Sequence, residues 1–279
     1  MPIWPFVIAV ILLLIIGLVL RVRSPTEREK LQVELAGLIE QERFEEAMPL
    51  AERAVDAADR EFEKWTRDLG EHHTNMMVAG WLAGALGTLG QLQFRMEDTD
   101  AAEASYQRAI SVLESSITQD LLIPADDRTP SPPHPDLPEA LLNLAFFYSE
   151  TERSAQAAST LRQTIEVEEA LDGKDHPVLA LPLVNLAEAL GHLGEQEEAE
   201  SALLRAIAVA EPHAASGEAV EFILFAAFNN LGQMYKRQGR VEEATAALQQ
   251  ALEIAEHNVE EHRPAIEGIR STLAELEAP

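Results

Sequence analysis

The chain has 279 residues, of which 48 are Asp or Glu and 21 are Lys or Arg, and its formal net charge is −27 at pH 7. Such an acidic surface repels phosphate backbones, so the composition argues against nucleic-acid binding. The charge is explained by solubility or, alternatively, by a preference for basic protein partners. The chain contains no cysteine, which excludes disulfides, thiolate metal ligands and cysteine nucleophiles.

Residues 1–23 are expected to form an N-terminal membrane anchor. Residues 3–20 carry no charge, and about eighteen apolar residues are the minimum for a helix that spans a bilayer. No Lys or Arg precedes this run and no A-x-A-like cleavage site follows it, which favours an uncleaved single-pass anchor over a signal peptide.

The residues after the anchor predict its orientation. Four basic residues follow the apolar run: Arg21, Arg23, Arg28 and Lys30. The positive-inside rule then places the rest of the chain in the cytoplasm. Lysine is scarce beside 17 arginines, a composition typical of GC-rich bacterial genomes. The sequence therefore predicts a bacterial inner-membrane protein with a cytoplasmic C-terminal domain.

Residues 26–279 are expected to be helical throughout. Ala, Leu, Glu, Gln and Arg dominate, and apolar residues recur at i, i+3, i+4 and i+7. Self-similarity divides this region into five units, near residues 31–60, 75–116, 137–171, 179–211 and 222–257. Each unit has an alanine at the same place: Ala47, Ala102, Ala157, Ala199 and Ala244. Antiparallel helices approach closely only where side chains are small, so we expect these alanines to be packing positions in a stack of helix pairs.

The sequence also predicts where helices end and how they are connected. Gly194 and Gly239 are expected to end the first helices of units four and five. Residues 123–138 hold six prolines and are expected to form a surface loop between units two and three. Pro264 is expected to start a last helix, residues 264–277, which caps the apolar face of the fifth unit.

This pattern resembles the tetratricopeptide repeat, and more specifically the kinesin light chain type of repeat, over roughly residues 31–257. The resemblance rests on two kinds of residue pair. Asn-Leu pairs occur at Asn143-Leu144, Asn185-Leu186 and Asn230-Leu231, and His-Pro pairs occur at His134-Pro135 and His176-Pro177. The resemblance implies an all-α fold, a right-handed superhelical solenoid of antiparallel helix pairs whose concave side is lined by first helices.

The sequence contains no recognisable catalytic or metal-binding motif. Histidine and carboxylate residues cluster only at Glu71–His73 and in the set His257, Glu261 and His262. Adjacent residues such as His72 and His73 point apart on a helix and cannot both bind one ion. We therefore interpret these groups as solvated surface side chains and predict no enzyme activity, no metal and no cofactor.

The candidate binding residues lie on the first helices. Asn143, Asn185 and Asn230 occupy one equivalent position in three successive units. An Asn side chain both donates and accepts, so this row could bind an extended peptide backbone, or each Asn could tie neighbouring helices together. The resemblance implies that Asn at this place faces the groove. Three more residues are expected to flank the groove: Tyr148, His192 and Arg237. Asn229 is a further candidate.

The sequence thus predicts a membrane-anchored scaffold that binds a protein or peptide partner in its concave groove without catalysis. Tethering would raise the effective concentration of partners in the same membrane. A second interpretation stays open, in which the same domain lies outside the cytoplasm and acts as an assembly factor or chaperone for secreted clients.

Overall fold

The computed structural model describes residues 27–69, 76–116 and 132–277. The predicted anchor, residues 1–23, and His72 and His73 lie outside these ranges. Every regular element in the described ranges is a helix, which confirms the prediction of an all-α repeat array. In this part of the chain, no helix is long and apolar enough to cross a membrane.

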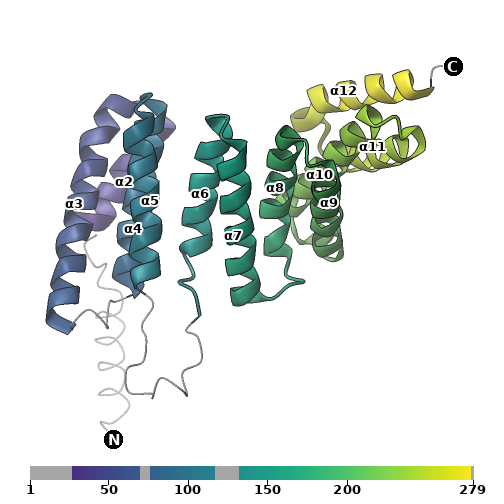
Figure 1. Ribbon diagram of the computed structural model, residues 1–279. Helices are drawn as coiled ribbons and strands as arrows, with labels where there is room; N and C mark the ends of the chain where they lie inside the picture. The colour runs from purple at the N-terminus through teal and green to yellow at the C-terminus, as the bar shows by residue number, and fades with distance from the viewer. Residues whose placement is uncertain (1–26, 70–75, 117–131, 278–279) are drawn as a thin grey trace, which may run out of the picture.

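The helices form five antiparallel pairs followed by one further helix (Figure 1). The pairs are α2 (Glu27–Glu40) with α3 (Phe44–Leu69), α4 (Met76–Arg95) with α5 (Thr99–Ser115), α6 (Leu137–Glu150) with α7 (Ser154–Asp172), α8 (Ala180–Leu193) with α9 (Gln196–Ala210), and α10 (Glu218–Arg237) with α11 (Val241–Ala255). The last helix is α12 (Val259–Glu277), and short 3₁₀ turns precede α8, α10 and α12. We number the pairs as units one to five.

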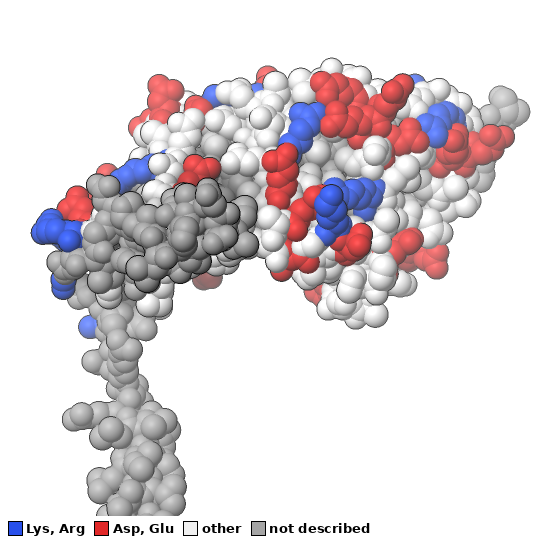
Figure 2. Space-filling view, turned by 60° about the horizontal axis from the view of Figure 1, so that its bottom comes forward, with Lys and Arg blue, Asp and Glu red and all other residues white. Residues whose placement is uncertain are grey.

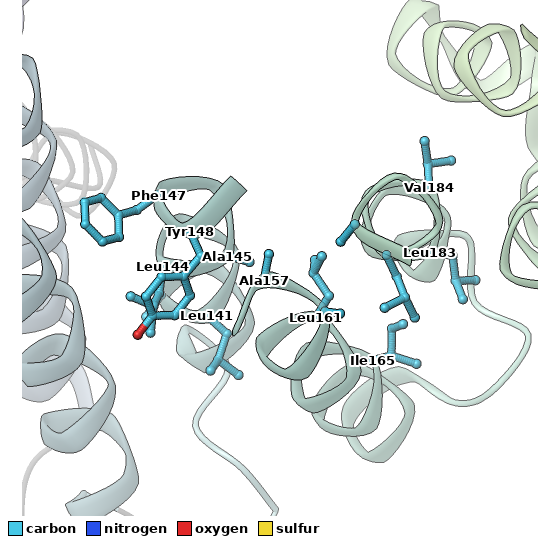
Figure 3. Packing of buried hydrophobic residues seen from close by; sticks show 14 of the residues in the cluster. Leu141, Leu144, Ala145, Phe147, Tyr148, Ala157, Leu161, Ile165, Leu183 and Val184 are labelled. Carbon is cyan, nitrogen blue, oxygen red and sulfur yellow. The ribbon is translucent and has the colours of Figure 1, made fainter. Parts of the chain in front are cut away.

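Small residues let the two helices of each unit approach. The five alanines at the repeated position are all buried. A Cβ added to Gly232 would lie 2.5 Å from Leu248 on α11, and one added to Gly90 would lie 3.0 Å from the Tyr106 ring on α5. In unit three, Ala145 and Ala157 occupy the contact between α6 and α7 (Figure 3). Glycine or alanine is therefore needed on the first helix where a large side chain of the second helix packs.

The turn inside each unit uses one backbone geometry. Gly194 and Gly239 have φ values of 80° and 73°, in the left-handed region that the sequence predicts for a helix-ending glycine. Units one to three have glutamate at the same place, also with positive φ: Glu42, Glu97 and Glu152. A glutamate in this region carries a steric cost that glycine avoids.

The His-Pro pairs cap the starts of two units. His134 Nδ1 accepts a hydrogen bond from the backbone N–H of Asp136 at 3.0 Å, and His176 Nδ1 accepts one from Val178 at 3.4 Å. His134 is buried, and its Nε2 lies 2.9 Å from the carbonyl oxygen of Met76 at the start of α4. One imidazole thus caps a turn and connects unit three to unit two.

Two predicted boundaries are corrected. The last helix does not start at Pro264 but at Val259, and Pro264 lies inside it. The proline-rich loop does not reach residue 138, because α6 starts at Leu137 and takes Pro138 into its first turn, where a missing N–H has no effect. Ile266 and Ile269 of α12 are buried in one apolar cluster with Leu248 and Ala251 of α11, so α12 covers the end of the array.

Candidate functional site

Two pockets lie between first helices of neighbouring units. The α4–α6 pocket encloses about 260 Å³ and is lined by both of those helices, with Tyr106 and Ala109 of α5 at its back. The α8–α10 pocket encloses about 430 Å³ and is lined by α8 and α10, with Ala199 and Leu203 of α9 at its back. The two pockets therefore occupy equivalent places in the repeat, on the side of the array formed by first helices.

Glycines open the α4–α6 pocket. Gly80, Gly84 and Gly87 of α4 line it. A Cβ on Gly84 would meet nothing within 4 Å, and one on Gly87 would lie 3.6 Å from Nδ2 of Asn143. The Phe146 side chain of α6 borders the same space and is 58% exposed. This pocket thus offers bare helix backbone beside an exposed aromatic ring.

The α8–α10 pocket has polar side chains from both helices that enclose it. His192 lies in the last turn of α8 and Arg237 in the last turn of α10, and both side chains are exposed. Four more polar side chains line it: Glu188, Gln196, Asn230 and Gln233. These groups offer hydrogen-bond donors, acceptors and a fixed positive charge to a bound chain.

Four of the six predicted groove residues line these pockets. Asn143 lines the α4–α6 pocket, and His192, Asn230 and Arg237 line the α8–α10 pocket. Asn185 is half-buried and, like Asn229, lines neither of them.

The asparagine side chains have free hydrogen-bonding capacity. Within the part of the chain that the structure describes, no side-chain hydrogen bond joins Asn143, Asn185 or Asn230 to a neighbouring helix. This geometry favours the ligand-binding interpretation of the asparagines over the one in which each ties helices together.

Tyr148 requires a correction. It does not flank the groove but is buried, 6% exposed, with its hydroxyl donating to Glu103 on α5 at 2.9 Å. Arg153 donates to the same carboxylate at 2.6 and 2.9 Å, and its guanidinium lies 4.5 Å from the Tyr148 ring centre. The hydrogen bond from Arg153 lowers the pKa of Glu103, and burial raises the pKa of Tyr148. This Glu–Tyr–Arg triad joins unit two to unit three.

The same triad joins unit four to unit five. Tyr235 donates to Glu200 on α9 at 2.8 Å, and Arg240 donates to that carboxylate at 2.8 and 3.1 Å. The Arg240 guanidinium lies 4.0 Å from the Tyr235 ring centre, and its hydrogen bond lowers the pKa of Glu200. Sequence analysis missed both triads. Their signal is a Tyr five residues before an Arg, with a Glu directly after the packing alanine of the preceding unit.

Among the described residues, no group of three or more His, Asp or Glu side chains is placed to hold a metal ion. His257 lies in the 3₁₀ turn Glu256–Asn258, and its Nδ1 is 3.8 Å from a carboxylate oxygen of Glu221. The pockets and the helix surfaces between them are therefore the candidate site.

Comparisons with known proteins agree with this architecture. Sequence models of the tetratricopeptide repeat match residues 83–112, 136–211 and 224–264, which together make up just over half of the chain. No curated protein matches the sequence.

Solved structures share the fold. BtubC (BKLC) from P. vanneervenii matches with 22% identity, a TM-score of 0.58, 81% of this chain covered and 82% of the other. A putative kinesin light chain with nearly identical TPR-like repeats, from Podospora anserina, matches with 18% identity, a TM-score of 0.53, 85% of this chain covered and 99% of the other. These structures show that the fold is similar to that of kinesin light chain-like proteins. Together with the matched repeats and the paired helices, this similarity shows that the chain belongs to the tetratricopeptide repeat family.

Proposed function

We propose that this chain is a non-catalytic scaffold that binds an extended segment of a protein partner along its first helices. The observation that carries the proposal is the pair of pockets at equivalent places in the repeat, each lined by an Asn with free hydrogen-bonding capacity. An Asn amide can pair with both the N–H and the C=O of a peptide, so Asn143 and Asn230 suit a backbone in extended form.

Filling the pockets without harming the fold tests this proposal. Gly84 and Gly191 line the two pockets, and a Cβ at either position meets nothing within 4 Å. Leu is a better helix former than Gly by about 1 kcal/mol, so Gly84→Leu with Gly191→Leu should keep or raise the melting temperature. The matched control is Gly268→Leu, on the exposed side of α12, where a Cβ also meets nothing.

The measurement is a pull-down from detergent-solubilised membranes, with captured proteins quantified by mass spectrometry. We expect the double variant to lose the proteins that the unaltered chain and the Gly268→Leu control both capture. A double variant that folds normally and captures the same proteins would show that partners bind elsewhere.

We further propose, from the sequence of residues 3–20, that the scaffold is tethered to a membrane with its repeat domain in the cytoplasm. Because the chain has no cysteine, one cysteine introduced at the exposed Ser149 is a unique label. A membrane-impermeant maleimide should label Ser149→Cys only after cells are permeabilised. Labelling of intact cells would instead support the alternative, an assembly factor or chaperone for secreted clients.

A further inference from the structure

The second helix of unit one is much longer than the first. α3 has 26 residues and its antiparallel partner α2 has 14. At about 1.5 Å per residue, α3 is therefore about 18 Å longer than α2. Because both helices start from the same short turn, the difference falls at the C-terminal end of α3, in residues 58–69. These residues extend past the first residue of α2, at the bottom of Figure 1, and we call them the α3 tip.

The α3 tip carries a row of basic side chains. Arg60, Lys64 and Arg67 are spaced i, i+4 and i+7, so they lie on one face of α3, and all three are exposed. The opposite face of the helix holds apolar residues such as Val55 and Ala58, which are buried. The basic row therefore points away from the core of the array.

The basic row has no acidic partner. Among the side chains that the structure describes, no carboxylate lies within 4 Å of Arg60, Lys64 or Arg67. Most basic side chains from α4 to α12 do have one, as Arg162 has in Glu198. Figure 2 turns this end of the array toward the viewer, with basic side chains at its left edge, over unit one, and abundant acidic ones over the C-terminal half. Unit one thus keeps positive charge that the other units neutralise.

The α3 tip lies at the end of the array where the chain enters unit one. α2 starts at Glu27, and only residues 21–26 separate it from the apolar segment 3–20 that we propose to span the membrane. Six residues cover at most about 22 Å, even when fully extended. The headgroup layer adds about 5–8 Å to each side of the hydrocarbon core. With unit one upright on the membrane, a tip that extends about 18 Å past Glu27 therefore reaches the headgroups.

We propose that the α3 tip binds anionic headgroups of the membrane in which the chain is tethered, through Arg60, Lys64 and Arg67. This inference rests on the membrane tether of the proposed function and names the lipid that the repeat domain recognises. Anionic lipids attract basic residues close to the membrane surface. Trp65, half-buried in the same part of α3, belongs to a residue type that is enriched at membrane interfaces.

The acidic residues of the tip do not interrupt the basic row. Glu61 and Glu63 are exposed, but they lie on either side of the row on the helix surface. Asp59, just before the row, already pairs with Arg108. A membrane span by itself leaves the domain free to turn, whereas a span and a bound tip together fix the orientation of unit one relative to the bilayer.

The experiment measures how close the tip lies to the lipid. The full chain has no cysteine, so Glu63→Cys gives one site for a nitrobenzoxadiazole dye. The labelled chain is reconstituted into vesicles that contain a lipid with a nitroxide quencher on its headgroup, in phosphatidylcholine with or without phosphatidylglycerol. We expect at least twofold more quenching with phosphatidylglycerol at low salt, where charges are least screened. The same dye at Ser149→Cys, at the far end of α6, should not be quenched in either lipid.

Charge reversal tests the basic row itself. In the Glu63→Cys chain, Lys64→Glu with Arg67→Glu should remove the preference for phosphatidylglycerol, and the milder Lys64→Gln with Arg67→Gln should reduce it. The matched control, Arg95→Glu with Arg237→Glu, reverses two exposed arginines in the last turns of α4 and α10 and should leave the quenching unchanged. Circular dichroism checks that each variant is folded.

Equal quenching in both lipids, or quenching that survives Lys64→Glu with Arg67→Glu, would overturn the assignment to anionic lipid. If the chain enters the vesicles and the dye at residue 63 is quenched in neither lipid, the tip does not touch the membrane, and this inference falls while the tether stands. A chain that does not float with the vesicles in a density gradient would instead remove the tether of the proposed function, and this inference with it.

Discussion

The contacts between units are built in two different ways. The joints between units two and three and between units four and five each hold a Glu–Tyr–Arg triad, in which the tyrosine and the arginine together donate three hydrogen bonds to a partly buried carboxylate. At the middle joint, between units three and four, the equivalent positions hold Ala158, Leu190 and Glu195. Leu190 and Ala158 are fully buried there, so apolar packing replaces the triad.

The middle joint also has ion pairs: those of Arg162 are more exposed than the triads, whereas the pair of Arg205 with Glu169 is as buried as they are. Arg162 of α7 lies 2.9 Å from Glu198 and 3.4 Å from Glu195, and these three side chains are 43–50% exposed. Arg205 of α9 donates to Glu169 at 2.6 Å and to the carbonyl oxygen of Lys174 at 3.0 Å. In Figure 3, Leu161 and Ile165 of α7 lie close to Leu183 of α8. The comparison teaches that small residues set the helix pairing in every unit, whereas the polar contacts between units are optional.

The largest effect expected is the loss of a triad carboxylate. Glu103→Ala or Glu200→Ala leaves a buried tyrosine hydroxyl without its acceptor and an arginine without its carboxylate, so each should lower the free energy of unfolding by about 2 kcal/mol. Arg162→Ala at the middle joint should cost less than about 0.5 kcal/mol, because exposed ion pairs contribute little. Urea unfolding followed by circular dichroism measures all three, and equal losses would show that the joints do not differ.

Removing only the tyrosine hydroxyl should have a smaller effect. Tyr148→Phe and Tyr235→Phe each delete one hydrogen bond to a carboxylate and should cost about 1 kcal/mol. Tyr106→Phe is the matched control, because in the described part of the chain the Tyr106 hydroxyl makes no hydrogen bond. Thermal unfolding compares the three variants, and a Tyr106→Phe loss as large as the other two would contradict the role assigned to the triads.

Acid should affect the two kinds of joint in opposite directions. Hydrogen bonds from Arg153 and Arg240 lower the pKa values of Glu103 and Glu200, so their contribution is present above about 4.5 and is lost as pH falls through the depressed values. Near the middle joint, burial raises the pKa of Glu168, and the negative charge of Asp172 raises it further. The ionised form of Glu168 is therefore unfavourable at pH 7, and this cost disappears when the carboxylate is protonated in acid.

Glu168→Gln should therefore raise the free energy of unfolding by up to about 1 kcal/mol at pH 7 and change it little near pH 4. Glu103→Gln should do the reverse, with a loss at pH 7 that shrinks as the pH falls. Denaturant unfolding at both pH values measures these changes. A gain for Glu103→Gln at pH 7 would contradict the assigned cause.

The turns on either side of the middle joint should give the smallest effects. Glu152→Gly removes a glutamate from positive φ and should stabilise by about 0.5 kcal/mol, because the steric relief exceeds the added entropy of the unfolded chain. Gly194→Glu places a glutamate in the same left-handed conformation at the equivalent turn and should lower the free energy of unfolding by a similar amount. Melting temperatures that shift together in one direction would show that the turns are not equivalent.

The sequence predicts the architecture well because its signal is local and repeated. A small residue recurs at Ala102, Ala157, Ala199 and Ala244 because the two helices of each unit pack closely there, so the recurrence predicts the all-α array. The predicted start of α12 was wrong because a proline inside a helix removes one i→i−4 hydrogen bond but does not always end the helix. Only the structure shows that Val259 precedes Pro264 in the same helix.

The candidate site was only partly predictable because it depends on contacts between units. Tyr148 looked like a groove residue from its spacing after Asn143, but its partner Glu103 lies 45 residues earlier in the sequence. Asn185 shares its repeat position with Asn230, yet it lines neither the α4–α6 pocket nor the α8–α10 pocket. The sequence periodicity predicts on which face of its helix a residue lies. How each unit is rotated relative to the next determines which residues of that face line a pocket.

The position of the middle joint has a mechanical consequence. Each unit of a repeat array contacts only its neighbours, so the array bends at its joints and not within its units. The α4–α6 pocket and the α8–α10 pocket lie on opposite sides of the middle joint. Flexing there changes the span between the two pockets but leaves each one intact, and a ligand that occupies both would act as a strut that fixes the curvature of the whole array.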